Sequence, residues 1–155
     1  MATNTLLQRL EAGETDVMNR LQVEVFLVGE GGTVVVGDAV ALDTATAGLT
    51  SAERSLFVLP ANATTLLNTV GVVLSSAETT GALTAGSKIN VCIRGICSAK
   101  VVAATGAGAI VRSSGTAGTL AAAVGGDAEN YTLVGRTITA EAAGFADVYV
   151  HGIHN

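Results

Sequence analysis

The sequence predicts an all-β protein: a small β-barrel or sandwich of two related β-units, preceded by a short, partly helical N-terminal arm. Two observations predict this fold. About ten short segments rich in Val, Ile and Leu alternate with Gly-rich turn signals roughly every 8 to 12 residues, a spacing typical of sandwiches and barrels. In addition, one stretch of the chain returns, shortened, near the C-terminus.

The repeated stretch spans residues 69–96 and returns as residues 133–153. Both copies contain a hydrophobic residue followed by Gly, then Ala-Glu-x-x-Gly, then an alternating strand that ends in Gly-Ile. Aligned on these features, Cys92 matches Tyr149 and Arg94 matches His151. The repeat indicates two β-units packed as one body, about residues 66–103 and 131–155. A β-solenoid would need at least three copies of a regular short period, whereas this chain has two copies of unequal length.

The predicted strands of the first half follow an arm at residues 1–20 and open a β-domain at 21–155. Gly-rich or small-residue segments separate them, and Gly37-Asp38 has turn chemistry because Gly supplies positive φ and Asp bonds its own backbone. The only proline, Pro60, closes one strand. The expected strands are 21–28, 33–36, 39–42, 55–60 and 66–74, with a turn at 29–32 and a loop at 43–52.

In the second half, the first repeat unit continues as strands at 88–93 and 96–103, joined by a tight turn at Arg94-Gly95. Residues 108–124 read as a short strand, a Gly-rich turn and another apolar run. A polar loop at 125–130 leads into the second unit. That unit closes the chain with strands at 131–139 and 146–153.

The N-terminal arm differs from the rest of the chain. Thr3 or Asn4 could cap a short helix through Leu6, Leu7 and Leu10, with Gly13 as its stop. One interpretation is a frayed terminus with some helix. The other is an arm that docks on a neighbouring subunit through these leucines, and amphipathic termini also often pack on their own domain.

Composition argues against several classes of function. Charged residues make up 14% and aromatic residues 3% of the 155 residues, and the formal net charge is −5. So few Lys and Arg residues cannot neutralise a row of phosphates, so we expect neither nucleic acid nor a membrane surface as a partner. No apolar run reaches about 18 residues, and the N-terminus lacks the basic region of a secretory signal, so we expect synthesis in a cytoplasm.

Low charge together with high apolar content has a further implication. Hydrophobic residues make up 49% of the chain against a charged share of 14%, where about 25% is usual. A monomer of this composition has little polar surface with which to cover itself. We therefore expect part of the surface to be buried against copies of the same chain or against a partner.

The two cysteines are the first candidate for chemistry. If Arg94-Gly95 is a two-residue turn, Cys92 faces Cys97 across the hairpin at a Cα separation of about 4.5 Å, at the short end of the disulfide range. The two readings are a cross-strand thiol pair able to form a disulfide and two buried free thiols. A zinc site would also need His151 and His154 on a neighbouring strand, and we predict no metal or cofactor.

No catalytic constellation is evident, and we predict that the protein is not an enzyme. The only histidines are the terminal His151 and His154, so a nucleophile would lack a base and an orienting group. Glu78 and Glu141 hold matching repeat positions, where each is expected in its own solvated loop. With Arg94 and Arg136, they are the only polar groups available to a ligand site inside the barrel.

Three phrases resemble those of small phage capsid decoration proteins, also called cement or head-stabilising proteins: GDAVAL at 37–42, VGVVL at 70–74 and INVCIRG at 89–95. The resemblance covers roughly residues 32–153 and is a pattern of turns and strands. It implies a homotrimer on the outside of an icosahedral head, often with terminal arms in contact, and no catalytic residues. The long N-terminus and the two cysteines depart from the pattern.

The resemblance and composition together predict a structural virion protein on the outer capsid surface, where it bridges and stabilises subunits of the major capsid protein. A fibre or tail component and a small ligand-binding β-barrel are the alternatives. The residues expected at the interface are the apolar ones of the arm and of the 55–60 strand: Leu6, Leu7, Leu10, Val17, Leu56, Phe57 and Leu59.

Overall fold

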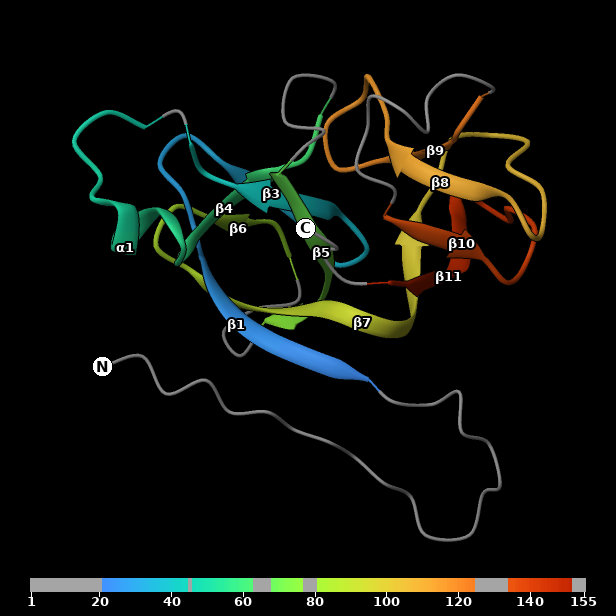
Figure 1. Cartoon of the computed structure of the whole chain (residues 1–155), viewed down its shortest axis with the longest axis horizontal. Helices are drawn as coiled ribbons and strands as arrows, with labels where there is room; N and C mark the ends of the chain where they lie inside the picture. The colour runs from blue at the N-terminus through green and yellow to red at the C-terminus, as the bar shows by residue number, and fades with distance from the viewer. Residues whose placement is uncertain (1–20, 45, 63–67, 77–80, 125–133, 152–155) are drawn as a thin grey trace, which may run out of the picture.

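The computed structural model describes residues 21–44, 46–62, 68–76, 81–124 and 134–151, and over this range the protein is all-β with one short helix (Figure 1). The all-β prediction is confirmed. The helix is α1 (Ser51–Arg54). The strands are β1 (Gln22–Val28), β2 (Thr33–Val34), β3 (Ala39–Leu42), β4 (Phe57–Pro60), β5 (Thr69–Ser76), β6 (Leu83–Thr84), β7 (Lys88–Lys100), β8 (Ile110–Ser113), β9 (Leu120–Ala122), β10 (Gly135–Thr137) and β11 (Phe145–Val150).

Nine of these strands form one sheet in the order β1-β4-β3-β5-β7-β11-β10-β8-β9. Strand β1 also pairs with β7, and this closes β1, β4, β3, β5 and β7 into a barrel. Strands β11, β10, β8 and β9 continue the sheet on the other side of β7, as the yellow-to-red half of Figure 1 shows. The short pair β2-β6 is separate from this sheet.

Strand β7 belongs to both halves of the molecule. It runs unbroken for 13 residues, so the predicted turn at Arg94-Gly95 is wrong. Its first part pairs with β1 and β5, and its second part, from Gly95 to Lys100, pairs with β11. Gly95 has a φ of 117°, a backbone region that favours glycine. This residue therefore redirects one strand between two ladders instead of reversing the chain into a hairpin.

Two apolar clusters fill the molecule, one on each side of the strands β3, β5 and β7. The barrel interior holds Phe26, Val28, Val34, Val40, Val58, Val70, Val73, Leu83, Ile89 and Val91. The second cluster holds Ala39, Ala41, Ala61, Val72, Cys92, Cys97, Ala99, Val101, Val111, Leu120, Val134, Ala146, Val148 and Val150. Because β3 and β5 each contribute residues to both clusters, these strands are apolar on both faces.

The sequence repeat corresponds to two equivalent strand pairs, β5 with β7 and β10 with β11. In each pair the glycine of the first strand lies directly over a backbone carbonyl of the second. A Cβ added to Gly71 would lie 2.1 Å from the Cys92 oxygen, and one added to Gly135 would lie 2.1 Å from the Tyr149 oxygen. Cys92 and Tyr149 are also the residues that the sequence alignment matches, so the repeat reflects the same close approach made twice.

Candidate interaction surfaces

The predicted interface residues of the arm, Leu6, Leu7, Leu10 and Val17, lie outside the described residues. Those of the 55–60 strand lie on β4 or just before it, and all three are half-buried. Leu59 packs over the turn after β1, since a Cβ at Gly32 would lie 2.7 Å from its Cδ2. The Leu56 carbonyl accepts a hydrogen bond from the Leu27 N–H at 2.9 Å. This segment is therefore largely engaged within its own domain.

The short helix α1 precedes β4 and is held by a capping box. Thr50 accepts a bond from the Glu53 N–H, and the Glu53 carboxylate accepts one from the Thr50 N–H at 2.8 Å. These bonds to Thr50, the backbone bond first, lower the pKa of Glu53. The capping box begins a helical turn within the loop expected at 43–52. This turn ends shortly before β4 and leads the chain through Leu56 into the strand.

The outer face of the second half of the sheet carries a row of large side chains that cross four strands. Ile96 of β7 pairs in register with Tyr149 of β11, Tyr149 with Arg136 of β10, and Arg136 with Ile110 of β8. Arg136 and Ile110 are exposed, and Ile96 and Tyr149 are half-exposed. We call these four residues the outer row.

The outer row has the composition of a protein–protein contact. Aromatic residues and arginine are enriched at such interfaces, and a sheet holds them rigidly in one plane. The ring of His151 meets that of Tyr149 edge to face at 5.0 Å, and Arg136 donates to the Gly108 carbonyl at 3.2 Å. The sequence-based interpretation missed this row. The only sequence feature that pointed to this row was the alternation of residues within 145–150 and 135–137. The strand pairing that brings the four residues together joins segments far apart in the sequence.

An ion pair between a buried carboxylate and a half-buried lysine joins the barrel to the end of β7. Asp38 Oδ1 lies 2.7 Å from Lys100 Nζ, and Asp38 Oδ2 accepts a hydrogen bond from the Val35 N–H at 2.8 Å. The backbone reinforces this junction, since the Lys100 N–H donates to the Gly37 carbonyl and the Gly37 N–H donates to the Val73 carbonyl, both at 2.8 Å. A carboxylate this deeply buried needs both a cation and an N–H donor, so Gly37-Asp38 has a structural role.

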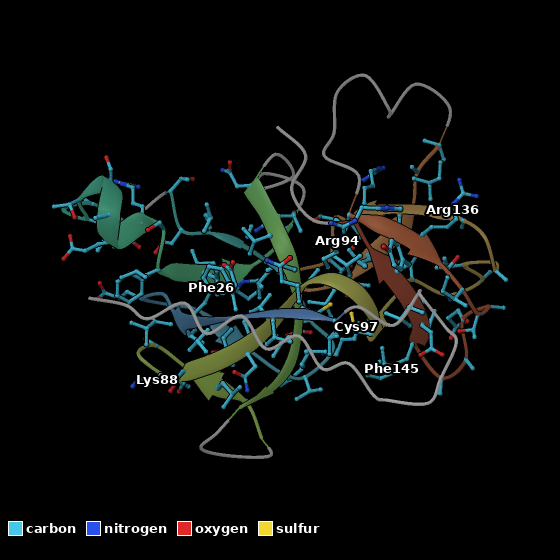
Figure 2. The ribbon with its side chains drawn as sticks, turned by 60° about the horizontal axis from the view of Figure 1, so that its bottom comes forward. Phe26, Lys88, Arg94, Cys97, Arg136 and Phe145 are labelled. Carbon is cyan, nitrogen blue, oxygen red and sulfur yellow. The ribbon has the colours of Figure 1, made fainter. Side chains whose placement is uncertain are left out.

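The two cysteines do not face each other across a hairpin, because both lie on β7. The prediction that the two thiols lie on opposite strands of a hairpin is therefore wrong. Cys92 and Cys97 are free and buried, and Figure 2 shows Cys97 near the centre, between the two halves. Cys92 Sγ lies 3.9 Å from the Gly95 carbonyl oxygen. A hydrogen bond with the Cys92 thiol, followed by burial, raises the pKa of Cys97, so this thiol stays protonated and poorly nucleophilic.

The polar residues considered for a ligand site do not converge on the barrel. Both arginines are exposed: Arg136 lies on β10, and Arg94 lies on β7 where that strand pairs with β1 (Figure 2). Glu141 caps a turn, where its carboxylate accepts from the Gly144 N–H at 2.7 Å and from the Ala104 N–H at 3.3 Å. Glu78 and His154 lie outside the described residues. The described barrel interior is instead filled by the apolar cluster around Phe26 and Ile89.

Within the part of the chain that the structure describes, no group of three or more His, Cys, Asp or Glu residues lies close enough together to hold a metal ion. No helix in that part is long and apolar enough to cross a membrane. Comparison with known proteins found no family model and no curated protein that matches the sequence.

Proposed function

We propose that this chain is a non-enzymatic structural protein of a phage virion, which decorates the outer surface of an icosahedral head and bridges subunits of the major capsid protein. The outer row is the observation that carries the proposal. It presents Tyr149 and Arg136, flanked by Ile96 and Ile110, on a rigid sheet of a protein with only 14% charged residues. The three phrases that resemble decoration proteins lie on or beside β3, β5 and β7, which are adjacent in the sheet.

The stabilisation would follow from mass action. A protein that binds the assembled shell, and not its free subunits, lowers the free energy of the shell by its binding free energy. Repetition over the lattice multiplies this effect, and a subunit that contacts two capsid proteins also gains from the high local concentration of the second site. A catalytic group is not needed for this role.

Binding to empty heads tests the proposal. The full chain, added to heads assembled from the major capsid protein of the encoding phage, is expected to bind saturably and to raise the temperature at which the heads disrupt. Arg136→Glu should weaken binding by about tenfold or more. Loss of a central interface residue typically costs about 1–2 kcal/mol of binding free energy, and about 1.4 kcal/mol corresponds to a tenfold change in the dissociation constant.

Lys88→Glu is the matched control. It makes the same charge reversal at an exposed residue on the barrel side of the molecule, far from Arg136 in Figure 2, and should leave binding unchanged. The proposal fails if the unmodified protein does not bind the heads. If both charge reversals weaken binding equally, the outer row is not the contact surface.

A further inference from the structure

Within residues 21–44, 46–62, 68–76, 81–124 and 134–151, no strand pairs with one edge of the N-terminal half of β1. On one side it pairs with β7 from Gln22 to Leu27, but on the other side β4 accompanies it only at Leu27 and Val28. Before Phe57 the chain turns into α1, so β4 does not extend back beside residues 22–26. In Figure 1 this part of β1 forms the lower rim of the barrel, with β7 above it.

Hydrogen bonds at the end of β1 establish which backbone groups face the unpaired edge. The Val28 N–H donates to Ser87, and its carbonyl accepts from Gly86, on the β7 side. The Leu27 N–H donates to Leu56, on the β4 side. Backbone N–H and C=O groups alternate in direction along a strand. Those of Val23 and Val25 therefore point to the same side as those of Leu27, at positions where β4 has not yet begun.

Most side chains along this edge are not of the kind that prevents pairing. Edge strands are usually protected by proline, lysine, an inward-pointing charge or a covering element. Here Val25 is 57% exposed, Val23 is half-exposed, and residues 21–28 contain neither Lys nor Pro. Glu24, half-exposed on the same strand face as Phe26, is the one charged residue of this segment. Among the described residues β1 is therefore an open template for another strand.

We propose that β1 pairs along this edge with β1 of a second copy of the chain, antiparallel about a two-fold axis through Val23. In this register Val23 lies opposite Val23 of the partner subunit, and Leu21 lies opposite Val25. Val23 and Val25 direct their backbone groups outward, Leu21 directly precedes β1, and the side chains that meet are apolar. Gln22 then lies opposite Glu24, a pair without like charges.

The neighbouring register is disfavoured by electrostatics. Shifting the centre to Glu24 would place two carboxylates directly opposite each other, about 4.5 Å apart at Cα in a non-hydrogen-bonded pair, which is destabilising. The ladder also stops at Val25, because the outward groups of Leu27 are already bonded to β4. So short a ladder forms a small interface, and the dimer is expected to be weak.

This pairing does not depend on the capsid role, and the isolated protein tests it. Sedimentation equilibrium from micromolar to millimolar concentration should show a monomer converting to a dimer. Val25→Pro removes an N–H that faces away from β7, so it should abolish the dimer while leaving the circular dichroism spectrum unchanged. A wild-type protein that stays monomeric at millimolar concentration, or a trimer that Val25→Pro does not alter, overturns the proposal.

Disulfide trapping reads the register directly. Val23 is the cross-strand neighbour of the free Cys92 on β7, so Val23→Cys and its control are both made in a Cys92→Ala background, which prevents an internal disulfide. In Val23→Cys the two new thiols lie across the axis at about 5.5 Å between Cα atoms, within disulfide range. Diamide accepts two electrons and two protons from such a pair as the S–S bond forms, and should give a covalent dimer. Val25→Cys is the control: its side chain is more exposed, so random collisions would favour it, yet it should cross-link several-fold more slowly. Equal or faster cross-linking of Val25→Cys rules out the register.

Discussion

At the scale of single residues, Gly71 and Gly135 explain why the sequence repeats. Each lies where a Cβ would be 2.1 Å from a carbonyl oxygen of the neighbouring strand, a separation that real Cβ atoms do not show. Because the obstructing atom is backbone, relief requires movement of β7 or β11 and not a change of rotamer. The repeated Val-Gly pair is thus a steric requirement imposed twice.

Gly71→Ala and Gly135→Ala should each reduce the free energy of unfolding by about 1–3 kcal/mol, because the added methyl group forces two paired strands apart. Urea denaturation measures this. Gly106→Ala and Gly115→Ala are matched controls, since a Cβ there meets nothing within 4 Å. Each control should reduce the free energy of unfolding by less than about 1 kcal/mol. If the controls lose as much stability as the other two variants, close approach is not the reason for the glycines.

At the scale of elements, β7 marks the limit of local prediction. Sequence alternation predicted strands at 88–93 and 96–103. Strand β7 includes the first segment and the second as far as Lys100, but the turn between them is absent. Gly95 supplies a positive φ in a hairpin and in a bent strand alike, so the local pattern is the same in both. Only the partners distinguish them, β1 and β5 before the bend and β11 after it.

Gly95→Ala should destabilise the protein by about 1–3 kcal/mol, because a Cβ is strained at a φ of 117°. The loss should be accompanied by faster amide hydrogen exchange in β11, which pairs with β7 only beyond the bend. Gly106→Ala again serves as the control. Wild-type stability together with unchanged exchange in β11 would show that the bend does not depend on glycine.

The surface residues show the same limit: the sequence predicts that apolar side chains are exposed, but not which of them lie side by side. Composition predicted that apolar surface would face a partner, which remains a prediction; Val25, Ile110 and Ile138 are 57%, 39% and 50% exposed. It could not show that Ile110 joins Tyr149 in one row, because that depends on the register of β8, β10 and β11. The Asp38–Lys100 pair was likewise hidden, since Gly37-Asp38 alone has the chemistry of an ordinary turn.

At the scale of the whole molecule, the two halves form one packed body. The second apolar cluster takes Ala39 and Val72 from the barrel and Val111 and Val148 from the other half. A buried hydrogen bond of 2.7 Å also joins the hydroxyls of Thr69 and Ser113, which lie on β5 and β8. Neither half can therefore open without exposing apolar surface and unpaired hydroxyl groups of the other.

Thermal unfolding should accordingly be a single two-state transition, even though the sequence is partly repeated. Differential scanning calorimetry should give equal calorimetric and van't Hoff enthalpies. Thr69→Val should lower the midpoint without splitting the transition, because it leaves the buried Ser113 hydroxyl without this partner. Two resolved transitions, in the wild type or in the variant, would mean that the halves are independent folding units.

The shared strand also gives the chain a direction of assembly during translation. All the barrel strands, from β1 to β7, have been synthesised once the ribosome passes Lys100. The nascent chain can therefore complete its first closed structure while residues 101–155 are still being made. The second half cannot fold first, because the strand it must pair with lies upstream. Early closure shortens the time during which apolar strands are exposed to other nascent chains.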